Sequence, residues 1–167
     1  MSQPGTVDLV VLGGGSGGYA AALRASELGM TVVMVEKDKV GGTCLHRGCI
    51  PTKALLHSAE TVDVIKEAGQ FGIKGTFESV DVAAVNAYKG KVVEGLYKGL
   101  SGLVKSRGIE VVQGTGTLVS PTAVEVDGRR IDRLPSFIRD LDARPGAVRT
   151  LNVAAVAAGA VGLNPPV

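Results

Sequence analysis

Two residues with redox chemistry, Cys44 and Cys49, are the only cysteines of the 167-residue chain and stand five positions apart. Helical side chains at this spacing point to different faces, and a disulfide needs Cα atoms within about 7 Å. A bridge between them therefore requires a distorted backbone. Gly48 supplies conformational freedom, and Pro51 disfavours helical geometry at Ile50. The pair indicates either a redox couple or two unrelated thiols.

A glycine-rich turn at residues 13–18 lies upstream of the cysteines and directly follows an apolar strand predicted at residues 7–12. Gly13, Gly15 and Gly18 fit the spacing G-x-G-x-x-G. The first glycine makes the tight turn, the second lets a pyrophosphate approach the backbone, and the third lets the helix pack on the strand. Alone, this pattern is weak, because any tight turn uses glycine.

The elements after the turn strengthen the pattern. An alanine-rich helix is predicted from Ser16 to Leu28 with Gly29 as its cap, and a β-branched strand follows at residues 31–36. The helix N-terminus favours an anion, and Glu36 at the strand end is placed to accept ribose hydroxyls. Strand, glycines, helix, strand and acid in this order predict a dinucleotide site.

Residues 8–36 together with the motif at residues 41–53 closely resemble the N-terminal part of the flavoprotein disulfide reductases. The resemblance implies an α/β fold, a Rossmann-like FAD-binding domain with a central parallel sheet, and NAD as the co-substrate. It also implies that Cys44 is the outer thiol, which exchanges with the substrate, and that Cys49 is the inner thiol against the flavin.

The same resemblance implies the residues that bind the cofactor. Thr43 and Lys53 are expected along the flavin end, and the turn from Gly114 to Gly116 near the adenine end. The implied cofactor-binding residues are Gly13, Gly15, Ser16, Gly18, Glu36, Lys37, Gly42, Thr43, Lys53, Gly114 and Gly116.

The chemistry of the thiols agrees with this placement. A helix predicted over residues 51–68 puts Cys49 at its start, where the helix dipole favours a thiolate, and Lys53 adds positive charge. His46 is expected to be a loop residue, since one His and two Cys at this spacing do not make a structural zinc set. His57 is expected to be a partly exposed helix residue. No metal site is predicted.

The next part of the chain is predicted to complete the sheet. Asp81 is a candidate N-cap of a long helix that ends at Gly108, and its apolar stripe is interpreted as packing. The stripe comprises Val85, Tyr88, Val92, Leu96 and either Leu100 or Leu103. Residues 109–113 are predicted as a third parallel strand, and residues 117–119 with 123–126 as an antiparallel pair.

The resemblance covers residues 1–128, interpreted as an incomplete FAD-binding domain. Residues 129–167 hold six Arg and no Lys, whereas residues 1–128 hold nine Lys and three Arg. A shifted reading frame, a fused segment and a divergent cap all account for this change, and the amino-acid sequence does not separate them. We expect an irregular tail from Arg129 onward.

Composition and charge restrict the function. The net charge of +2 is carried by the tail, so it does not indicate nucleic-acid binding. The segment before the first predicted strand, residues 1–6, is too short and too polar to be a signal peptide. The apolar stretch at residues 153–163 is too short to span a bilayer. A cytoplasmic protein without a membrane partner is expected.

Two functional hypotheses remain. The first is an FAD-dependent oxidation of a dithiol with NAD; the motif is most similar to that of family members that oxidise lipoyl groups of 2-oxo acid dehydrogenase complexes as homodimers. Glutathione and mercuric reductases share the cysteine spacing. The second is a truncated, inactive chain, because the family's NAD domain, interface domain and His-Glu pair have no counterpart in these 167 residues.

Overall fold

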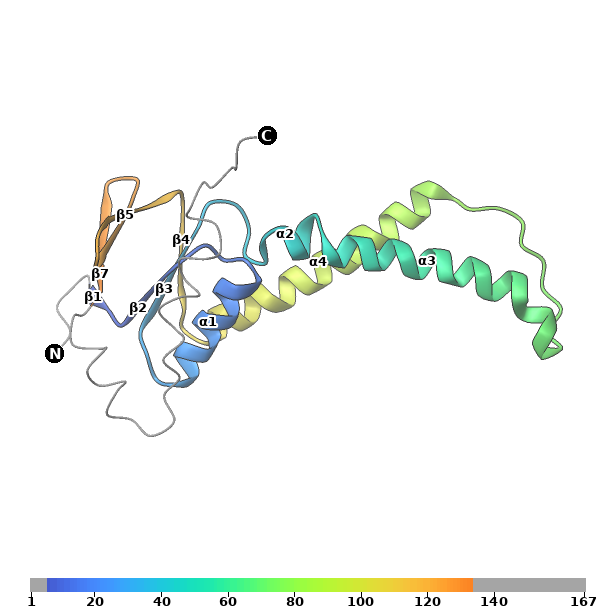
Figure 1. Cartoon of the computed structure of the whole chain (residues 1–167), viewed down its shortest axis with the longest axis horizontal. Coiled ribbons are helices and arrows are strands. Elements are labelled where there is room, and N and C mark those ends of the chain that lie inside the picture. Colours follow the sequence, from blue (N-terminus) through green and yellow to red (C-terminus); the bar gives the residue numbers. More distant parts are fainter. Residues whose placement is uncertain (1–5, 134–167) are drawn as a thin grey trace. The chain divides into compact units, whose positions relative to one another are not determined.

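The computed structural model describes residues 6–133, which separate into two compact units. Unit 1 holds the described residues up to Gly42 and from Leu100 onward, and unit 2 is Thr43–Gly99. In chain order the elements, labelled in Figure 1, are β1 (Thr6–Val7), β2 (Leu9–Leu12), α1 (Ser16–Glu27), β3 (Val32–Glu36), α2 (Gly42–His46), α3 (Cys49–Glu67), the 3-10 helix η1 (Ala68–Phe71), α4 (Val82–Ser106), β4 (Glu110–Gln113), β5 (Gly116–Ser120), β6 (Ala123–Val126) and β7 (Arg129–Arg133).

The central sheet of unit 1 has three parallel strands in the order β2-β3-β4. Leu9 pairs with Val32, and Val33 pairs with Glu110. This confirms the predicted parallel sheet. Because parallel strands end at the same edge, the sheet brings the ends of β2, β3 and β4 together at one place, where ligands of open α/β sheets bind.

β3 separates two hydrophobic cores, because alternate side chains of a strand face opposite sides. Val32 and Met34 belong to the core on the side of α1, which also contains Val104 from the end of α4. Val33 and Val35 belong to the core on the other side. A strand buried on both faces explains the uninterrupted apolar run in its sequence.

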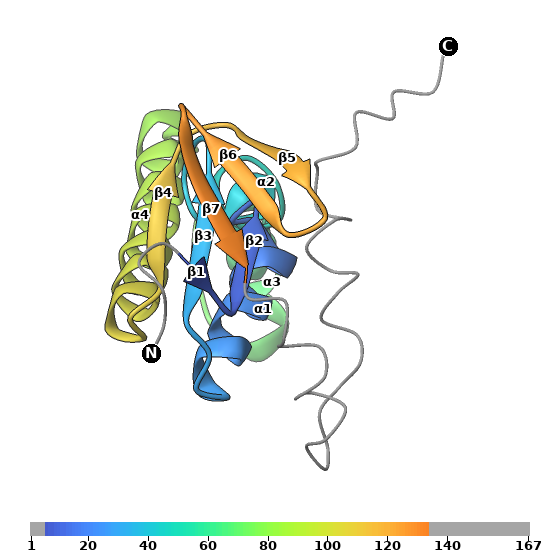
Figure 2. The same cartoon turned by 90° about the vertical axis from the view of Figure 1, so that its left-hand side faces the viewer.

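The second sheet of unit 1 has four strands in the order β1-β7-β6-β5. β5, β6 and β7 are antiparallel, as predicted for the first two, and β1 joins β7 in parallel. Val124, Val126 and Ile131 from this sheet fill the second core. Figures 1 and 2 show β5, β6 and β7 in orange, with β1 in dark blue beside β7, on the face of the central sheet away from α1.

The predicted strand at residues 7–12 differs in one respect, because it is interrupted at Asp8. The Asp8 carboxylate accepts hydrogen bonds from the Thr31 amide at 2.8 Å and the Thr31 hydroxyl at 2.7 Å. These bonds turn the chain, so that β1 pairs with β7 in the second sheet while β2 pairs with β3.

The predicted irregular tail also needs a correction at its start. Residues Arg129–Arg133 form β7, which pairs antiparallel with β6, so that Ile131 lies opposite Val124. The side chain of Ile131 is 2% exposed, so its burial holds the strand on the domain. The remainder of the predicted tail, residues 134–167, lies outside the described residues.

Unit 2 consists mainly of α3 and most of α4. Asp81 caps α4 as predicted, since its carboxylate accepts a hydrogen bond from the Ala84 amide at 3.0 Å. The interpretation of the α4 stripe as packing is confirmed for part of it: Leu100 packs against the core that contains Val104, and Val85 and Val92 are half-buried. The other stripe residues, Tyr88, Leu96 and Leu103, are exposed. Helical periodicity defines a face without determining what covers it.

Candidate functional site

The glycine turn between β2 and α1 has the geometry that its sequence predicts. Gly13 has φ +98°, and its amide donates to the carbonyl of Val35 at 2.8 Å. A Cβ on Gly18 would overlap the carbonyl oxygen of Gly13, so only glycine lets the helix approach the turn this closely. The structure therefore explains why glycine is needed at Gly13 and Gly18.

The middle of the turn can receive an anion. A Cβ on Gly15 would meet no atom within 4 Å, so the backbone is open on that side. α1 begins at Ser16 with no side-chain cap and no acidic residue in its first turn. No side-chain cap therefore competes with an anion for the first amide groups of the helix.

The segment at Gly41 and Gly42 lies against the glycine turn. The Gly41 amide donates to the Gly14 carbonyl at 2.7 Å. Gly42 has φ +58°, and a Cβ there would lie 2.8 Å from Cα of Gly15. A side chain on Gly42 would thus displace the turn, and Gly41 has φ +108°, which favours glycine. These two residues form one wall of the candidate site.

Glu36, the predicted ribose ligand, lies beside the same turn. Its Oε2 accepts a hydrogen bond from the Gly14 amide at 2.6 Å, and its Oε1 accepts one from the Asp38 amide at 2.8 Å. Each carboxylate oxygen has a second lone pair, so the group can accept hydroxyl donors while it is held by the backbone. Lys37, also predicted to bind the cofactor, is exposed next to it.

The end of β4 supplies the third part of this site. The Gly114 amide donates to the carbonyl of Glu36 at 3.0 Å, and Gln113 Nε2 donates to the carbonyl of Asp38 at 2.8 Å. A Cβ on Gly116 would overlap the Leu12 side chain. The sheet therefore gathers the predicted cofactor-binding residues of unit 1 at the carboxyl ends of its three strands.

In unit 2, the two cysteines lie on either side of a helix break. Cys44 is in α2, Cys49 is the first residue of α3, and the chain turns at Gly48 with φ −126° and ψ −111°. A Cβ on Gly48 would lie 3.1 Å from the Thr43 carbonyl oxygen, which explains the glycine. The expected distortion at Ile50 is wrong: Ile50 is helical, because a helix tolerates proline in its first turn.

The break brings the two thiols into contact. The pKa of Cys44 is raised, first by a side-chain hydrogen bond with Cys49 and then by burial, while the positive charge of Lys53 acts to lower it. Both cysteines are free thiols. The i, i+5 thiols therefore lie within hydrogen-bond reach of each other.

The expected order of exposure of the thiols is reversed. Cys44 is half-buried and Cys49 is exposed, whereas the motif predicts Cys44 as the accessible thiol. The cause is local: the chain folds back over Cys44, so that a Cβ on Gly48 would lie 3.4 Å from the Cys44 Cα, while Cys49 starts α3. Thr43 and Lys53, the predicted flavin-end residues, are both exposed.

The two histidines have different surroundings. His57 is exposed on α3, with its Nδ1 3.6 Å from Oε2 of Glu60, as expected of a surface helix residue. His46, expected to be a loop residue, is the last residue of α2. Its ring packs edge-to-face on Tyr97 with 5.1 Å between the ring centroids. The sequence gives no signal of this contact, because the two residues are far apart along the chain.

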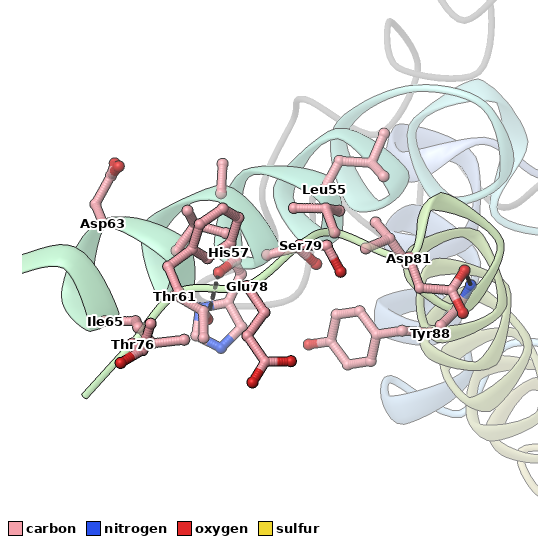
Figure 3. Close-up of a pocket in the computed structure, with 17 residues that line it drawn as sticks. Leu55, His57, Thr61, Asp63, Ile65, Thr76, Glu78, Ser79, Asp81 and Tyr88 are labelled. Atoms are coloured by element: carbon pink, nitrogen blue, oxygen red, sulfur yellow. Dashed lines mark hydrogen bonds between the residues drawn. The ribbon is translucent and has the colours of Figure 1, made fainter.

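Unit 2 also contains a hollow that the sequence does not predict (Figure 3). It has a volume of about 940 Å³ and lies between α3, the segment at residues 76–81 and the first turns of α4. Its walls are mainly apolar, and Asp63, Glu78 and Asp81 are the acidic residues that line it. Periodicity reveals the helix faces but not the extended segment that lies between them.

Two kinds of structure are absent from the described part of the chain, a membrane-spanning helix and a metal-binding cluster. Within residues 6–133, no helix combines the length and apolar composition needed to cross a membrane. In the same range, no three His, Cys, Asp or Glu side chains are grouped so that they could hold a metal ion.

Comparison with known proteins identifies relatives. The family model for pyridine nucleotide-disulphide oxidoreductase matches residues 7–133. The chain is 47% identical to dihydrolipoyl dehydrogenase of Chlamydia pneumoniae over 73% of the chain and 26% of that protein. It is 48% identical to dihydrolipoyl dehydrogenase of Bacillus subtilis over 69% of the chain and 24% of that protein. It is 48% identical to leghemoglobin reductase of Vigna unguiculata over 72% of the chain and 23% of that protein. The chain thus spans about a quarter of the length of these relatives.

Proposed function

Because the chain belongs to the pyridine nucleotide-disulphide oxidoreductase family, we propose that it is part of an FAD-dependent dihydrolipoyl dehydrogenase. The reaction converts dihydrolipoamide and NAD to lipoamide and NADH. The observation that carries the proposal is the contact of the Cys44 and Cys49 thiols across the break between α2 and α3. The family consists of FAD-dependent flavoproteins that use NAD.

The residues of unit 1 fit FAD. The open side of Gly15 and the uncapped first turn of α1 suit a pyrophosphate, and the Glu36 carboxylate is fixed where a ribose would follow. Gly114 donates its amide to the Glu36 carbonyl, and a side chain on Gly114 or Gly116 would overlap Val126 or Leu12, so both glycines keep the end of β4 close to the site. When bound, FAD supplies the acceptor for the two electrons of the dithiol.

The thiols of unit 2 carry out the exchange. A substrate thiolate attacks Cys44 Sγ of the Cys44–Cys49 disulfide; a new S–S bond forms, the old one breaks, and Cys49 leaves as a thiolate. The second substrate thiolate then attacks the substrate sulfur of this mixed disulfide and releases Cys44. The substrate dithiol is oxidised by two electrons and the protein disulfide is reduced to two thiols. Lys53 stabilises the thiolate form of Cys44.

The partners and the activity of the 167-residue polypeptide are separate parts of the proposal. By family, the substrate is the lipoyl group of 2-oxo acid dehydrogenase complexes in the cytoplasm, and the working enzyme is a homodimer. We expect the polypeptide by itself to show no NAD-linked turnover, since residues 6–133 contain one glycine-rich strand-turn-helix, which is assigned to FAD.

The test is trapping of the exchange intermediate. The full chain is reduced, freed of reductant, and incubated with lipoamide, and thiols and masses are measured. The unsubstituted chain should lose two thiols and gain a disulfide. The Cys49→Ser chain should hold one covalent lipoyl adduct on Cys44, whereas the Cys44→Ser chain should hold none. An adduct confined to the Cys44→Ser chain would reverse the roles of the thiols, and no loss of thiols in the unsubstituted chain would refute the function.

FAD binding is tested separately by equilibrium dialysis. A Gly15→Val side chain occupies the open face of the turn, so it should abolish FAD retention, whereas Gly17→Val, which meets no atom within 4 Å at its Cβ, should preserve it. Equal retention by both variants would contradict the assigned site.

A further inference from the structure

The segment between the cysteines needs support from elsewhere in unit 2. α2 is five residues long, and a helix this short is not stable by itself, because nucleation costs more than a single turn returns. Two side chains of the segment make tertiary contacts: Leu45 is 7% exposed, and the His46 ring packs on Tyr97. The position of Cys44 therefore depends on these contacts.

The contact between His46 and Tyr97 joins α2 to α4. The ring centroids are 5.1 Å apart and the ring planes are inclined by 69°, which is the favourable edge-to-face arrangement. Both residues are half-buried, so the contact is partly shielded from water. His46 is two residues from Cys44 and three from Cys49, so any displacement of its ring moves the backbone that links the thiols.

We propose that Tyr97, acting through His46, is a positioning residue that presets the Cys44–Cys49 pair for disulfide formation. This inference rests on the proposed thiol exchange. It concerns the stability of the disulfide and not the chemistry of the flavin, and neither aromatic residue takes part in bond making or breaking.

The physical basis is the strict geometry of the disulfide. The two Cβ atoms must lie about 3.8 Å apart with a defined torsion, so each backbone rotation that is free between the thiols adds an entropic cost to bond formation. The aromatic contact holds this segment already in the dithiol form. An edge-to-face pair contributes enough that its loss should lower the equilibrium constant for disulfide formation roughly 2- to 10-fold.

The expected effect separates a positioning role from simple packing. Tyr97→Phe keeps the ring and should leave the equilibrium constant within a factor of about two. Tyr97→Leu keeps an apolar side chain but loses the ring, and should show the full decrease. His46→Leu should show the same decrease, and the double variant should show no more than either single change, because both remove one contact.

The experiment is a redox titration of the full chain in mixtures of reduced and oxidised dithiothreitol. Protein dithiol and oxidised dithiothreitol give protein disulfide and reduced dithiothreitol, so two electrons and two protons are transferred together. Free thiols are alkylated and counted by mass. Tyr88→Leu, on the same helix and 42% exposed, is the matched control and should behave as the unsubstituted chain.

The outcomes are distinct. If the unsubstituted chain forms no disulfide, the proposed function fails. If it forms one and Tyr97→Leu matches it, or Tyr97→Phe decreases as much as Tyr97→Leu, the positioning role is refuted. Circular dichroism verifies folding; should Tyr97→Leu unfold, His46→Leu decides, because a change within five-residue α2 leaves α4 intact.

Discussion

Units 1 and 2 differ in where their apolar side chains lie. In unit 1, Val11 and Met34 are fully buried and Val104 is 2% exposed, so the sheets and helix ends enclose two cores. In unit 2, only Leu45 and Ala54 are buried, while Val64 and Phe71 are 67% and 75% exposed. The comparison shows that the apolar side chains of the strands are buried on both faces of the sheet. The apolar stripe of a long helix does not by itself determine which element covers it.

The units also differ in the chemistry of their candidate sites. In unit 1 the site is made of backbone: glycines, amide groups and one carboxylate fixed by amides. In unit 2 it is made of side chains, the two thiols and Lys53. Changes in unit 1 should therefore act through steric overlap and burial, and changes in unit 2 through charge and mobility.

The largest effect is expected from Gly18→Ala in unit 1. The added methyl group would overlap the Gly13 carbonyl oxygen, and backbone gives way less easily than a side chain. Overpacking typically costs about 1–3 kcal/mol, and this substitution should lie at the upper end or beyond. The free energy of unfolding is measured by urea denaturation.

Gly17→Ala is the matched control for this prediction. Its Cβ meets no atom within 4 Å, and alanine is favoured over glycine within a helix by up to about 1 kcal/mol. It should leave stability unchanged or increased. Equal losses from the two substitutions would mean that the third glycine of the turn is not a packing position.

The next largest effect is expected from shortening a buried valine, and the same change at an exposed valine of another helix tests the difference in burial between the units. Val104→Ala removes methyl groups from the core of unit 1 and should lower the free energy of unfolding by about 1–3 kcal/mol. Val64→Ala on exposed α3 should change it by less than about 0.5 kcal/mol. Hydrogen exchange and urea denaturation measure both. A comparable loss at Val64 would show that α3 is covered in solution, which would break the comparison.

A smaller effect is expected in the reactivity of unit 2. The hydrogen bond to Cys49 raises the pKa of Cys44, so its thiolate forms at higher pH than that of an ordinary thiol and alkylation below that pH is slowed. Lys53→Gln removes a charge that lowers this pKa, so the midpoint of the alkylation profile should rise further. Lys66→Gln, at the far end of α3, is the control. A midpoint below that of a free cysteine would contradict the assignment.

Much of unit 1 was predictable because its signals are local. The glycine spacing predicted the tight turn at Gly13 and the close packing at Gly18, and the β-branched runs predicted the three parallel strands. Asp8 was missed, since the hydrogen bonds to Thr31 join residues distant in sequence. β7 was missed because the arginine-rich composition from Arg129 onward was interpreted as an irregular tail, although Ile131 is buried.

The thiol site was predictable in composition but not in its exposure. The spacing and Gly48 indicated a distorted segment, and the structure places the break there. Which thiol is covered depends on how the chain folds back over Cys44, which no periodicity reveals. The contact of His46 with Tyr97 likewise depends on the packing of α2 beside α4.

The smallest effects are expected from exposed ion pairs, one in each unit. Arg129 donates to Glu110 at 2.7 Å and joins β7 to β4, and Glu94 pairs with Lys98 at 2.6 Å within α4. Both pairs are about half exposed or more, so solvent screens them. Glu110→Gln and Glu94→Gln should shift the urea midpoint less than Val104→Ala does, and 1 M salt should remove both shifts.

Acid should distinguish the contributions of these two pairs. The pKa of Glu94 is lowered by Lys98, so its pair stabilises the fold above the ordinary pKa of a glutamate and the stabilisation is lost as the pH falls through the lowered value. The pKa of Arg129 is raised by Glu110, so the guanidinium of that pair stays charged throughout an acid titration. Glu110→Gln should speed hydrogen exchange in β7 at neutral pH, because the pair joins strands of different sheets, whereas Glu94→Gln should affect only its own turn of α4. Unchanged exchange in β7 would show that burial of Ile131 alone holds this strand on unit 1.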